Sequence, residues 1–215
     1  MPKKMPVLPE TIECSLVLID LSGFTQMIYL SQSSEQTMLL VLKAMQRFFR
    51  ESEKAAEKIG DVTIINNTGD GFIAIAEGKL PSRRALSFVQ DVSTIYKRFV
   101  KSVLHSLPFR QRIDLRVALH HGTVHRVDIG SPSSSNRFLY LGDDLNLLSR
   151  VINSQVARKY GFAITRGFYR RLMLKKKQTT PQADEIILDR NQYPEPIEIY
   201  RLPVEIPEYR VDEEL

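Results

Sequence analysis

The spacing of apolar residues divides the chain into short strands and amphipathic helices. Residues 14–20 (CSLVLID) form an apolar run with β-branched members, which predicts a buried strand that ends at an acid. LSGFT then predicts a turn into a short helix over 25–31, and a longer helix is expected over 34–58. Ser33 and Gln36 have the spacing of a capping box, and Gly60 marks the helix end. The apolar residues expected to form the core face of this helix are Met38, Leu42, Met45, Phe48 and Phe49.

The rest of the chain continues this alternation. DVTIIN and GFIAIA, joined by NTGD, predict a hairpin over 61–76. The further elements expected are a helix over 81–104, strands over 113–120 and 122–128, a helix over 144–158, a short strand over 162–165, and a terminal hairpin from EIILD and IEIYRL. The order β-α-α-β-β-α-β predicts a ferredoxin-like α+β fold, in which helices cover one face of an antiparallel-rich sheet. One domain with a short tail is expected.

Composition narrows the class of protein. The 215 residues are 43% hydrophobic and 26% charged, which is typical of a soluble globular chain with one sizeable core. The longest clean apolar stretch, 16–21, is far too short for a membrane span, and MPKKMPVLPE lacks the apolar segment of a signal peptide. The single cysteine, Cys14, excludes an internal disulfide and a cysteine-based zinc site. A cytoplasmic protein is therefore expected.

The charge balance leaves several partners open. Lys and Arg number 30 against 25 Asp and Glu, a net charge of +5 and a pI near 9.3. Such an excess suits nucleic acid, an anionic surface or a phosphorylated substrate. The charge is scattered apart from the pair Arg170 and Arg171 and the run Lys175, Lys176 and Lys177, which favours a solvated loop. Without an RNP-like or helix-turn-helix pattern, nucleic-acid binding is disfavoured.

Two acids occupy positions suited to metal binding. Asp20 ends the first strand before a glycine-containing turn, and Asp70 lies in the NTGDGF hairpin. If these strands are neighbours, the two carboxylates meet at one sheet edge, as Mg²⁺ sites that also bind phosphates require. The amides of residues 21–25, at a helix start, could bind phosphate oxygens. As an alternative, both acids are also common turn and capping residues.

A second polar group lies in YLGDDLNLLSRV. Asn146 and Arg150 are four residues apart on a predicted helix and therefore share a face, where they could bind a sugar and a phosphoryl oxygen. A surface polar pair beside a core stripe is the alternative. The neighbours His120 and His121 would point to opposite faces of a strand, which disfavours a shared metal. Walker and dinucleotide-binding glycine motifs are absent.

Four segments together resemble the class III nucleotidyl cyclase catalytic domain. LVLIDLSGFT resembles the family's first metal motif, and INNTGDGFIAIAE resembles its second. LRVALHHGTVHRVDIG resembles the Arg-x-Gly-x-x-x-Gly segment, with Ala118 where glycine is usual, and YLGDDLNLLSRV resembles the Gly-x-x-x-Asn-x-x-x-Arg helix. The resemblance covers residues 15–172 in order. It implies a catalytic domain over 14–205, an N-terminal extension over 1–13 and a C-terminal tail over 206–215.

The resemblance also implies roles for individual residues. Asp20 and Asp70 would hold two Mg²⁺ or Mn²⁺ ions per active site, with a backbone carbonyl from Ile19 or Leu21. Asn146 would orient the ribose, and Arg150 would stabilise charge on the α-phosphate as the 3′-hydroxyl displaces pyrophosphate. Phosphate binding is expected at Gly23, Phe24 and Thr25. A head-to-tail homodimer is implied, because one subunit supplies the aspartates and the other supplies the asparagine and arginine.

The base-reading positions depart from the family pattern. Asn66 stands where adenylate-type members have lysine, and Leu139 stands where they have Asp or Thr. Neither position has the guanine-type acid. Some standalone bacterial members make cyclic UMP or cyclic CMP in anti-phage defence, and the short chain fits that group. A nucleotidyl cyclase with a pyrimidine product is therefore expected; an adenylate cyclase and a catalytically silent binding module are the alternatives.

Overall fold

The structure is a computed structural model that describes residues 8–110, 112–130, 137–173, 183–186 and 197–201. Its strands are β1 (Glu10–Ser22), β2 (Val62–Asn67), β3 (Gly71–Ala76), β4 (Asp114–Asp128), β5 (Phe138–Leu141), β6 (Phe162–Thr165), β7 (Ala183–Ile186) and β8 (Ile197–Arg201). Its helices are α1 (Phe24–Ser31), α2 (Glu35–Ile59), α3 (Pro81–Ile95), the π-helical η1 (Tyr96–Lys101), α4 (Ser102–Leu104), α5 (Asp143–Ile152), α6 (Gln155–Tyr160) and α7 (Arg166–Met173).

The strands form one sheet in the order β2-β3-β1-β4-β6-β8-β7, with β5 paired to β4. β1 lies at the centre, antiparallel to β3 on one side and to β4 on the other. Only β4 and β6 are parallel among the described strands. The predicted order β-α-α-β-β-α-β and the antiparallel-rich sheet are confirmed.

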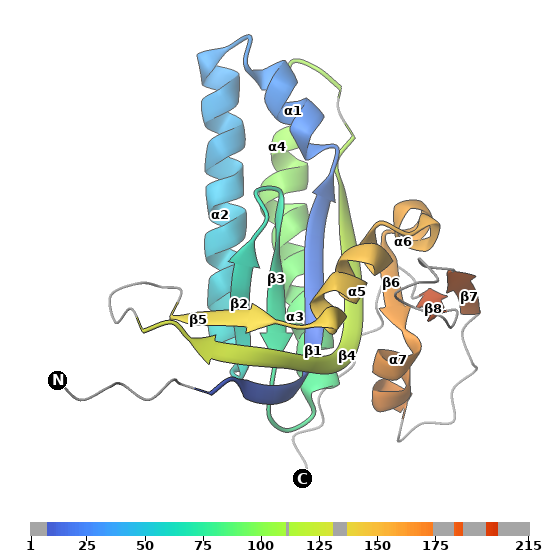
Figure 1. The fold of residues 1–215 in the computed structure, drawn as a ribbon. Helices are drawn as coiled ribbons and strands as arrows, with labels where there is room; N and C mark the ends of the chain where they lie inside the picture. Colours follow the sequence, from blue (N-terminus) through green and yellow to red (C-terminus); the bar gives the residue numbers. More distant parts are fainter. Residues whose placement is uncertain (1–7, 111, 131–136, 174–182, 187–196, 202–215) are drawn as a thin grey trace, which may run out of the picture.

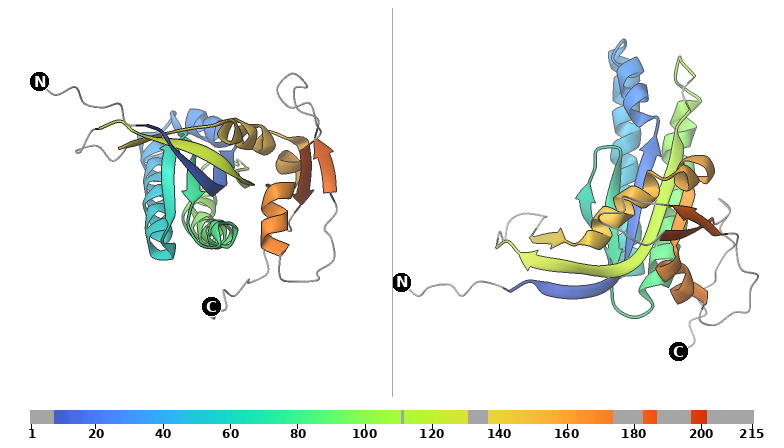
Figure 2. Two further views of the ribbon diagram at one scale, coloured as in Figure 1. Left: turned by 60° about the horizontal axis from the view of Figure 1, so that its bottom comes forward. Right: turned by 45° about the vertical axis from the view of Figure 1, so that its right-hand side comes forward.

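Helices cover both faces of this sheet, so the expectation of one covered face is wrong (Figures 1 and 2). Val17 and Ile19 of β1 pack in the cluster that contains the buried residues of α2 and α3. Leu16 and Leu18 point the other way and pack against α5. Alternate residues of a strand face opposite sides, so a strand that is apolar on both sides requires a layer on each.

Helix α2 differs from the prediction in two details. The N-cap is Ser34 rather than Ser33, and its hydroxyl accepts the Thr37 amide hydrogen. The Ser33 hydroxyl instead donates to the Leu30 carbonyl. Met45 and Phe48 lie in the core, but Leu42 is 51% exposed and belongs to the outer face.

Strand β4 is continuous where two strands separated by a glycine turn were expected. Gly122 lies inside it, opposite Cys14. A Cβ atom at this position would lie 2.2 Å from the Asp144 carboxylate, so close packing of α5 against β4, and not a turn, requires the glycine. The helix expected over 144–158 is likewise two helices, α5 and α6.

The C-terminal strands β7 and β8 are antiparallel and extend the sheet beyond β6, as the terminal hairpin predicted. The serine-rich stretch 131–136, the lysine run 175–177 and the tail 206–215 lie outside the described residues. Among the helices that the structure describes, none combines the length and apolarity needed to cross a membrane.

Candidate active site

The sheet places Asp20 and Asp70 at the same edge, where β1 ends and the chain turns from β2 into β3. Asp20 is paired in register with Gly71, the residue after Asp70, and the Leu21 amide donates to the Asp70 carbonyl at 3.1 Å. Gly71 is required for this approach, because a Cβ atom there would lie 1.9 Å from the Ile19 carbonyl oxygen. The predicted juxtaposition of the two acids is present in the structure.

Asp20 is paired with Arg116, a residue to which sequence reasoning gave no role. The Arg116 Nε and Nη2 atoms donate to Asp20 Oδ2 at 2.7 and 2.5 Å, and both side chains are 17% exposed. The pKa of Asp20 is raised above its usual value, mainly because the carboxyl is buried. The hydrogen bond and charge of Arg116 lower this pKa, and the charge of Asp70 adds to the rise. The Asp20 carboxylate is thus held by one cation and lies close enough to Asp70 to feel its charge.

The turn after β1 exposes backbone donors beside these acids. Gly23 has φ 87° and forms the N-cap of α1, and no side chain accepts a hydrogen bond there. The first intrahelical bond runs from the Met27 amide to the Gly23 carbonyl. The amides of Phe24 and Thr25 therefore begin the helix without an intrahelical acceptor, which is the arrangement that binds anions.

Asn146 and Arg150 lie on α5, a different element from those that carry Asp20 and Asp70. The start of α5 is fixed to β4 near Thr123, whose amide donates to Asp144 Oδ2 at 2.6 Å. Thr123 lies seven positions along β4 from Arg116, which places this end of α5 roughly 20 Å from Asp20. Asn146 is exposed on the helix surface. The hydrogen bonds to the Asp20 carboxylate come from Arg116 on β4.

The two residues expected to read the base lie on strands that do not pair. Asn66 is an exposed residue of β2, next to a register irregularity between Ile64 and Asn66. Leu139 lies on β5 and is 46% exposed. Both side chains are exposed and therefore accessible to a ligand.

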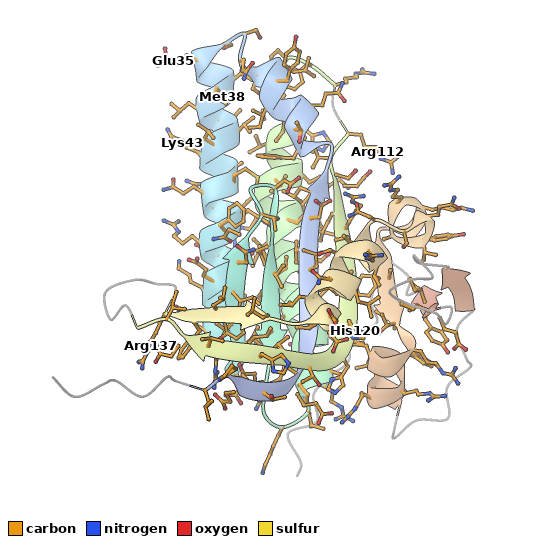
Figure 3. The ribbon with its side chains drawn as sticks, in the orientation of Figure 1. Glu35, Met38, Lys43, Arg112, His120 and Arg137 are labelled. Atoms are coloured by element: carbon orange, nitrogen blue, oxygen red, sulfur yellow. The ribbon has the colours of Figure 1, made fainter. Side chains whose placement is uncertain are left out.

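A buried histidine fixes the start of α5. His120 is 8% exposed; its Nε2 contacts Asp144 Oδ1 at 3.0 Å, and its Nδ1 contacts Thr165 Oγ1 at 2.8 Å (His120 is labelled in Figure 3). Because a carboxylate can only accept, Nε2 carries the hydrogen. His121 points to the opposite face and contacts Ser15 and Glu13, as its position in a strand predicts. Sequence reasoning missed the His120–Asp144 contact because it joins residues 24 positions apart.

A comparison with models of protein families shows the family to which the chain belongs. A profile of the adenylate and guanylate cyclase catalytic domain matches residues 7–202. The chain belongs to this family. It is thus a class III nucleotidyl cyclase domain, a phosphorus–oxygen lyase by class.

Solved structures agree with this cyclase fold. Guanylyl cyclase Cya2 aligns with a TM-score of 0.69 at 16% identity, over 91% of this chain and 93% of that one. Adenylyl cyclase CyaB from P. aeruginosa aligns with a TM-score of 0.67 at 17% identity, over 89% of this chain and 94% of that one. The guanylate cyclase domain of RhGC from Catenaria anguillulae, in complex with GTP, aligns with a TM-score of 0.61 at 18% identity. The alignment covers 89% of this chain and 96% of that one. No match was found among curated proteins.

The acid pair of the cyclase domain fits hard divalent cations. Asp20 and Asp70 supply carboxylate oxygens, the ligand type that Mg²⁺ and Mn²⁺ prefer. Among the described residues, no group of three or more His, Cys, Asp or Glu could hold a metal ion. A site with two carboxylates leaves coordination positions for water and phosphate, which fits the usual mode of Mg²⁺ binding.

The His120–Asp144 contact predicts a pH-dependent contribution to stability. In Asp144→Asn, the side-chain amide has only one oxygen, so it cannot accept from both His120 and the Thr123 amide. The substitution is expected to lower the free energy of unfolding by about 1–2 kcal/mol at pH 7. The His120 hydrogen bond lowers the pKa of Asp144, so this contribution is complete above the unfolded pKa of about 3.9 and is lost as pH falls through the lower folded value. Urea unfolding of both proteins between pH 7 and pH 3 measures the difference. A difference that stays constant below pH 4 would contradict the assignment, and Asp91→Asn controls for removal of a carboxylate outside this contact.

Proposed function

We propose that this cyclase domain converts a nucleoside triphosphate to a 3′,5′-cyclic nucleotide and pyrophosphate. The observation that carries the proposal is the meeting of Asp20 and Asp70 at one sheet edge, beside the uncapped start of α1. The ribose 3′-oxygen attacks the α-phosphorus, its proton passes to solvent water, and the bond to the α,β-bridging oxygen breaks to release pyrophosphate. Two Mg²⁺ or Mn²⁺ ions would supply Lewis-acid stabilisation of the attacking oxygen and of the triphosphate.

The chain's own residues position the substrate for this reaction. Asp20 and Asp70, with the Leu21 carbonyl, hold the metal side of the site. The amides of Gly23, Phe24 and Thr25 bind the phosphates at the start of α1. Asn146 orients the ribose, and Arg150 stabilises the negative charge that develops on the α-phosphate in the transition state.

The proposed active form is a head-to-tail homodimer. Asn146 lies in the first turn of α5, and this helix begins roughly 20 Å from Asp20 within one chain, so a second protomer would bring Asn146, together with Arg150 of the same helix, to the acids. The hairpin formed by the end of β4 with β5 supports such an interface, since Ile129, Phe138, Leu139 and Leu141 are exposed apolar residues on it.

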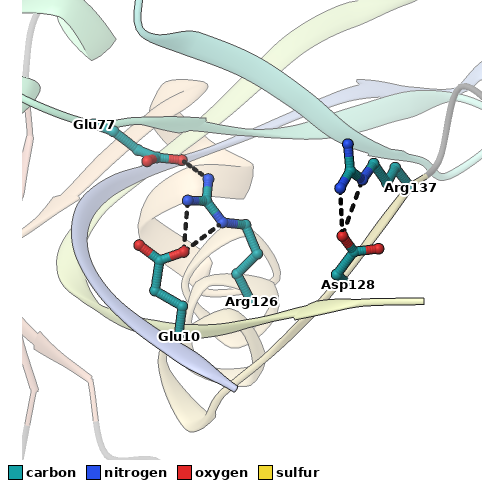
Figure 4. A network of polar contacts seen from close by, with 5 residues as sticks. All are labelled: Glu10, Glu77, Arg126, Asp128 and Arg137. Carbon is teal, nitrogen blue, oxygen red and sulfur yellow. Dashed lines mark hydrogen bonds and ion pairs between the residues drawn. The ribbon is translucent and has the colours of Figure 1, made fainter. Parts of the chain in front are cut away.

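Ion pairs hold this hairpin in place. Arg126 bridges Glu10 at 2.7 Å and Glu77 at 3.4 Å, and thereby ties β4 to the start of β1 and the end of β3 (Figure 4). Arg137 pairs with Asp128 at 2.7 Å across the hairpin. Each exposed pair adds little stability by itself, but together they fix the direction of an apolar edge strand that a second copy could cover.

The proposed product is a pyrimidine cyclic nucleotide, cyclic UMP or cyclic CMP, acting as an anti-phage signal. Asn66 and Leu139 support this preference. Leu139 cannot accept a hydrogen bond from the adenine amino group, and Asn66 lacks the positive charge of the adenylate-type lysine. Neither residue supplies the acid that would accept from guanine.

A competition experiment tests the base preference. Purified protein is incubated with an equimolar mixture of ATP, GTP, CTP and UTP in Mn²⁺, and cyclic products are separated by mass spectrometry. Cyclic UMP and cyclic CMP are expected to exceed cyclic AMP and cyclic GMP. A dominant purine product would contradict the pyrimidine assignment and leave the cyclase assignment intact.

The two base-reading positions can also be exchanged. The double variant Asn66→Lys with Leu139→Asp supplies the adenylate-type pair and is expected to raise the ratio of cyclic AMP to pyrimidine products about tenfold or more. Both side chains are exposed in the chain, so the fold should tolerate the change. An unchanged product ratio in the folded variant would show that these residues do not read the base. The matched control is Asn67→Lys alone, at the exposed neighbour of Asn66 on β2 and outside the proposed interface.

A further inference from the structure

A large pocket lies beside the acid pair, on the far side of Arg116. Its volume is about 1120 Å³, slightly above the usual range for ligand pockets. Residues from α3, η1, α4, α6 and the first part of β4 line it. The parallel strand β6 pairs with β4 only from Val117 onward, and beyond that point Gly161 lies against the Leu115 carbonyl, so residues 114–116 of β4 form the pocket wall without a partner strand on this side among the described strands.

The floor of the pocket is apolar. Tyr96, Ile113 and Phe162 are buried residues of the main core, and Phe109 packs against the same cluster. The Tyr96 hydroxyl donates to the Ile113 carbonyl at 2.5 Å, so the polar end of that side chain is satisfied within the protein. What remains facing the pocket from these residues is ring and aliphatic surface, which favours an apolar or aromatic ligand body.

The rim is strongly basic. The seven lysines and arginines that line the pocket are Lys97, Lys101, Arg110, Arg112, Arg116, Arg158 and Lys159, and Asp114 is the single acid among its lining residues. Asp114 is paired with Arg112, which projects from the side of the fold in Figure 3. Within the described residues, no acidic side chain pairs with Lys97, Lys101, Arg110 or Arg158. The chain as a whole has 30 basic against 25 acidic residues, so this rim concentrates positive charge far above the average.

We propose that this pocket binds an organic anion with an apolar or aromatic body and at least one phosphate, sulfonate or carboxylate group. Free phosphate would leave the apolar floor unused, and a neutral apolar molecule would leave the cations of the rim unpaired. The two parts of the pocket match the two parts of an amphipathic anion.

The ligand would also act on the proposed cyclase site, and this second step rests on the proposed function. Arg116 is a lining residue of the pocket, and its guanidinium donates to Asp20. An anion that attracts Arg116 loosens its pair with Asp20 and changes the charge available to a metal ion. Occupation of the pocket therefore alters turnover from a position outside the substrate contacts.

Fluorescence titration tests the pocket directly. The probe 8-anilinonaphthalene-1-sulfonate carries an aromatic body and one anionic group, and N-phenyl-1-naphthylamine has the same body without the charge. The double variant Lys101→Glu with Arg158→Glu is expected to bind the sulfonate about tenfold more weakly than wild type, because two rim cations are reversed. The neutral probe should bind both proteins alike.

The matched control reverses two exposed cations on the outer face of α2, Lys43→Glu with Arg47→Glu, so that the net charge falls equally. This control is expected to bind the sulfonate within about twofold of wild type. Equal sulfonate affinity in wild type and the folded rim variant, or an equal loss in both double variants, would overturn the proposal. The single variants Lys101→Glu and Arg158→Glu, each expected to weaken binding about threefold, keep the test valid if the double variant does not fold.

Failure of the pocket and failure of the cyclase assignment are distinguishable. Asp70→Asn removes a proposed metal ligand that does not line the pocket, and it is expected to bind the sulfonate as wild type does. Rim-dependent binding in a chain without cyclase activity would overturn the effect on turnover and support the pocket. Cyclase activity with rim-independent binding would overturn the pocket alone.

Discussion

Asp70→Asn is expected to reduce cyclic nucleotide formation by about 10²–10³-fold or more while leaving the fold intact. The substitution keeps the shape of the side chain and removes the charge that a divalent cation requires. The described residues give the Asp70 side chain no ion pair, and its backbone carbonyl still accepts from Leu21. The loss should therefore appear in turnover rather than in stability, measured by product formation and by thermal unfolding of the same sample.

Asp70 is a sharper target than Asp20. Asp20→Ala would leave Arg116 buried without its partner, so lost activity could reflect lost structure. Asp91→Asn, on α3, removes one carboxylate elsewhere and serves as the control, with activity expected within about twofold of wild type. Wild-type turnover in folded Asp70→Asn would contradict the metal assignment.

Mixing two inactive variants tests the shared site. Asp70→Asn and Arg150→Ala are each expected to be inactive as homodimers. If one protomer supplies the acids and the other supplies Arg150, each heterodimer contains one intact site and one doubly altered site. Since half of the dimers in a freely exchanging equimolar mixture are heterodimers, the mixture should recover about one quarter of wild-type activity.

The recovery depends on the arrangement of the site. A site formed within a single chain would remain inactive in the mixture, because every chain carries one damaged half. The control mixture of Arg150→Ala with Asn146→Ala should recover no activity beyond that of the separate variants under the same conditions, since both changes damage the half of the site that α5 supplies. Recovery in the control mixture would contradict the division of roles between the protomers.

The acid pair could be predicted from the sequence because local patterns are enough to place it. Asp20 ends an apolar strand and Asp70 lies in a hairpin turn, so pairing of the two segments brings both to one edge. Arg116 could not be assigned in the same way. Its pairing with Asp20 follows from the register between β1 and β4, which joins residues 96 positions apart. Sequence periodicity determines the face on which each side chain lies, but not which residue of β4 stands opposite Asp20.

The errors in the predicted fold have physical causes as well. The run from Leu16 to Ile19 is apolar on both faces, a pattern that indicates helices on both sides of the sheet rather than on one side. Glycine is typical of turns, but Gly122 lies within β4. It is glycine because the Asp144 carboxylate approaches this position too closely for a Cβ atom. That contact belongs to the His120 arrangement, which forms only when β4, β6 and α5 are assembled.

The most direct test of the proposed chemistry is a product balance. Purified wild-type protein is incubated with each nucleoside triphosphate in Mn²⁺, and cyclic nucleotide and pyrophosphate are measured together, with Asp70→Asn in parallel. A cyclase should form the two products one-to-one from at least one nucleotide, and Asp70→Asn should form neither. Absence of cyclic product from all four nucleotides with folded, dimeric protein, or equal formation by Asp70→Asn, would contradict two-metal cyclisation at this sheet edge.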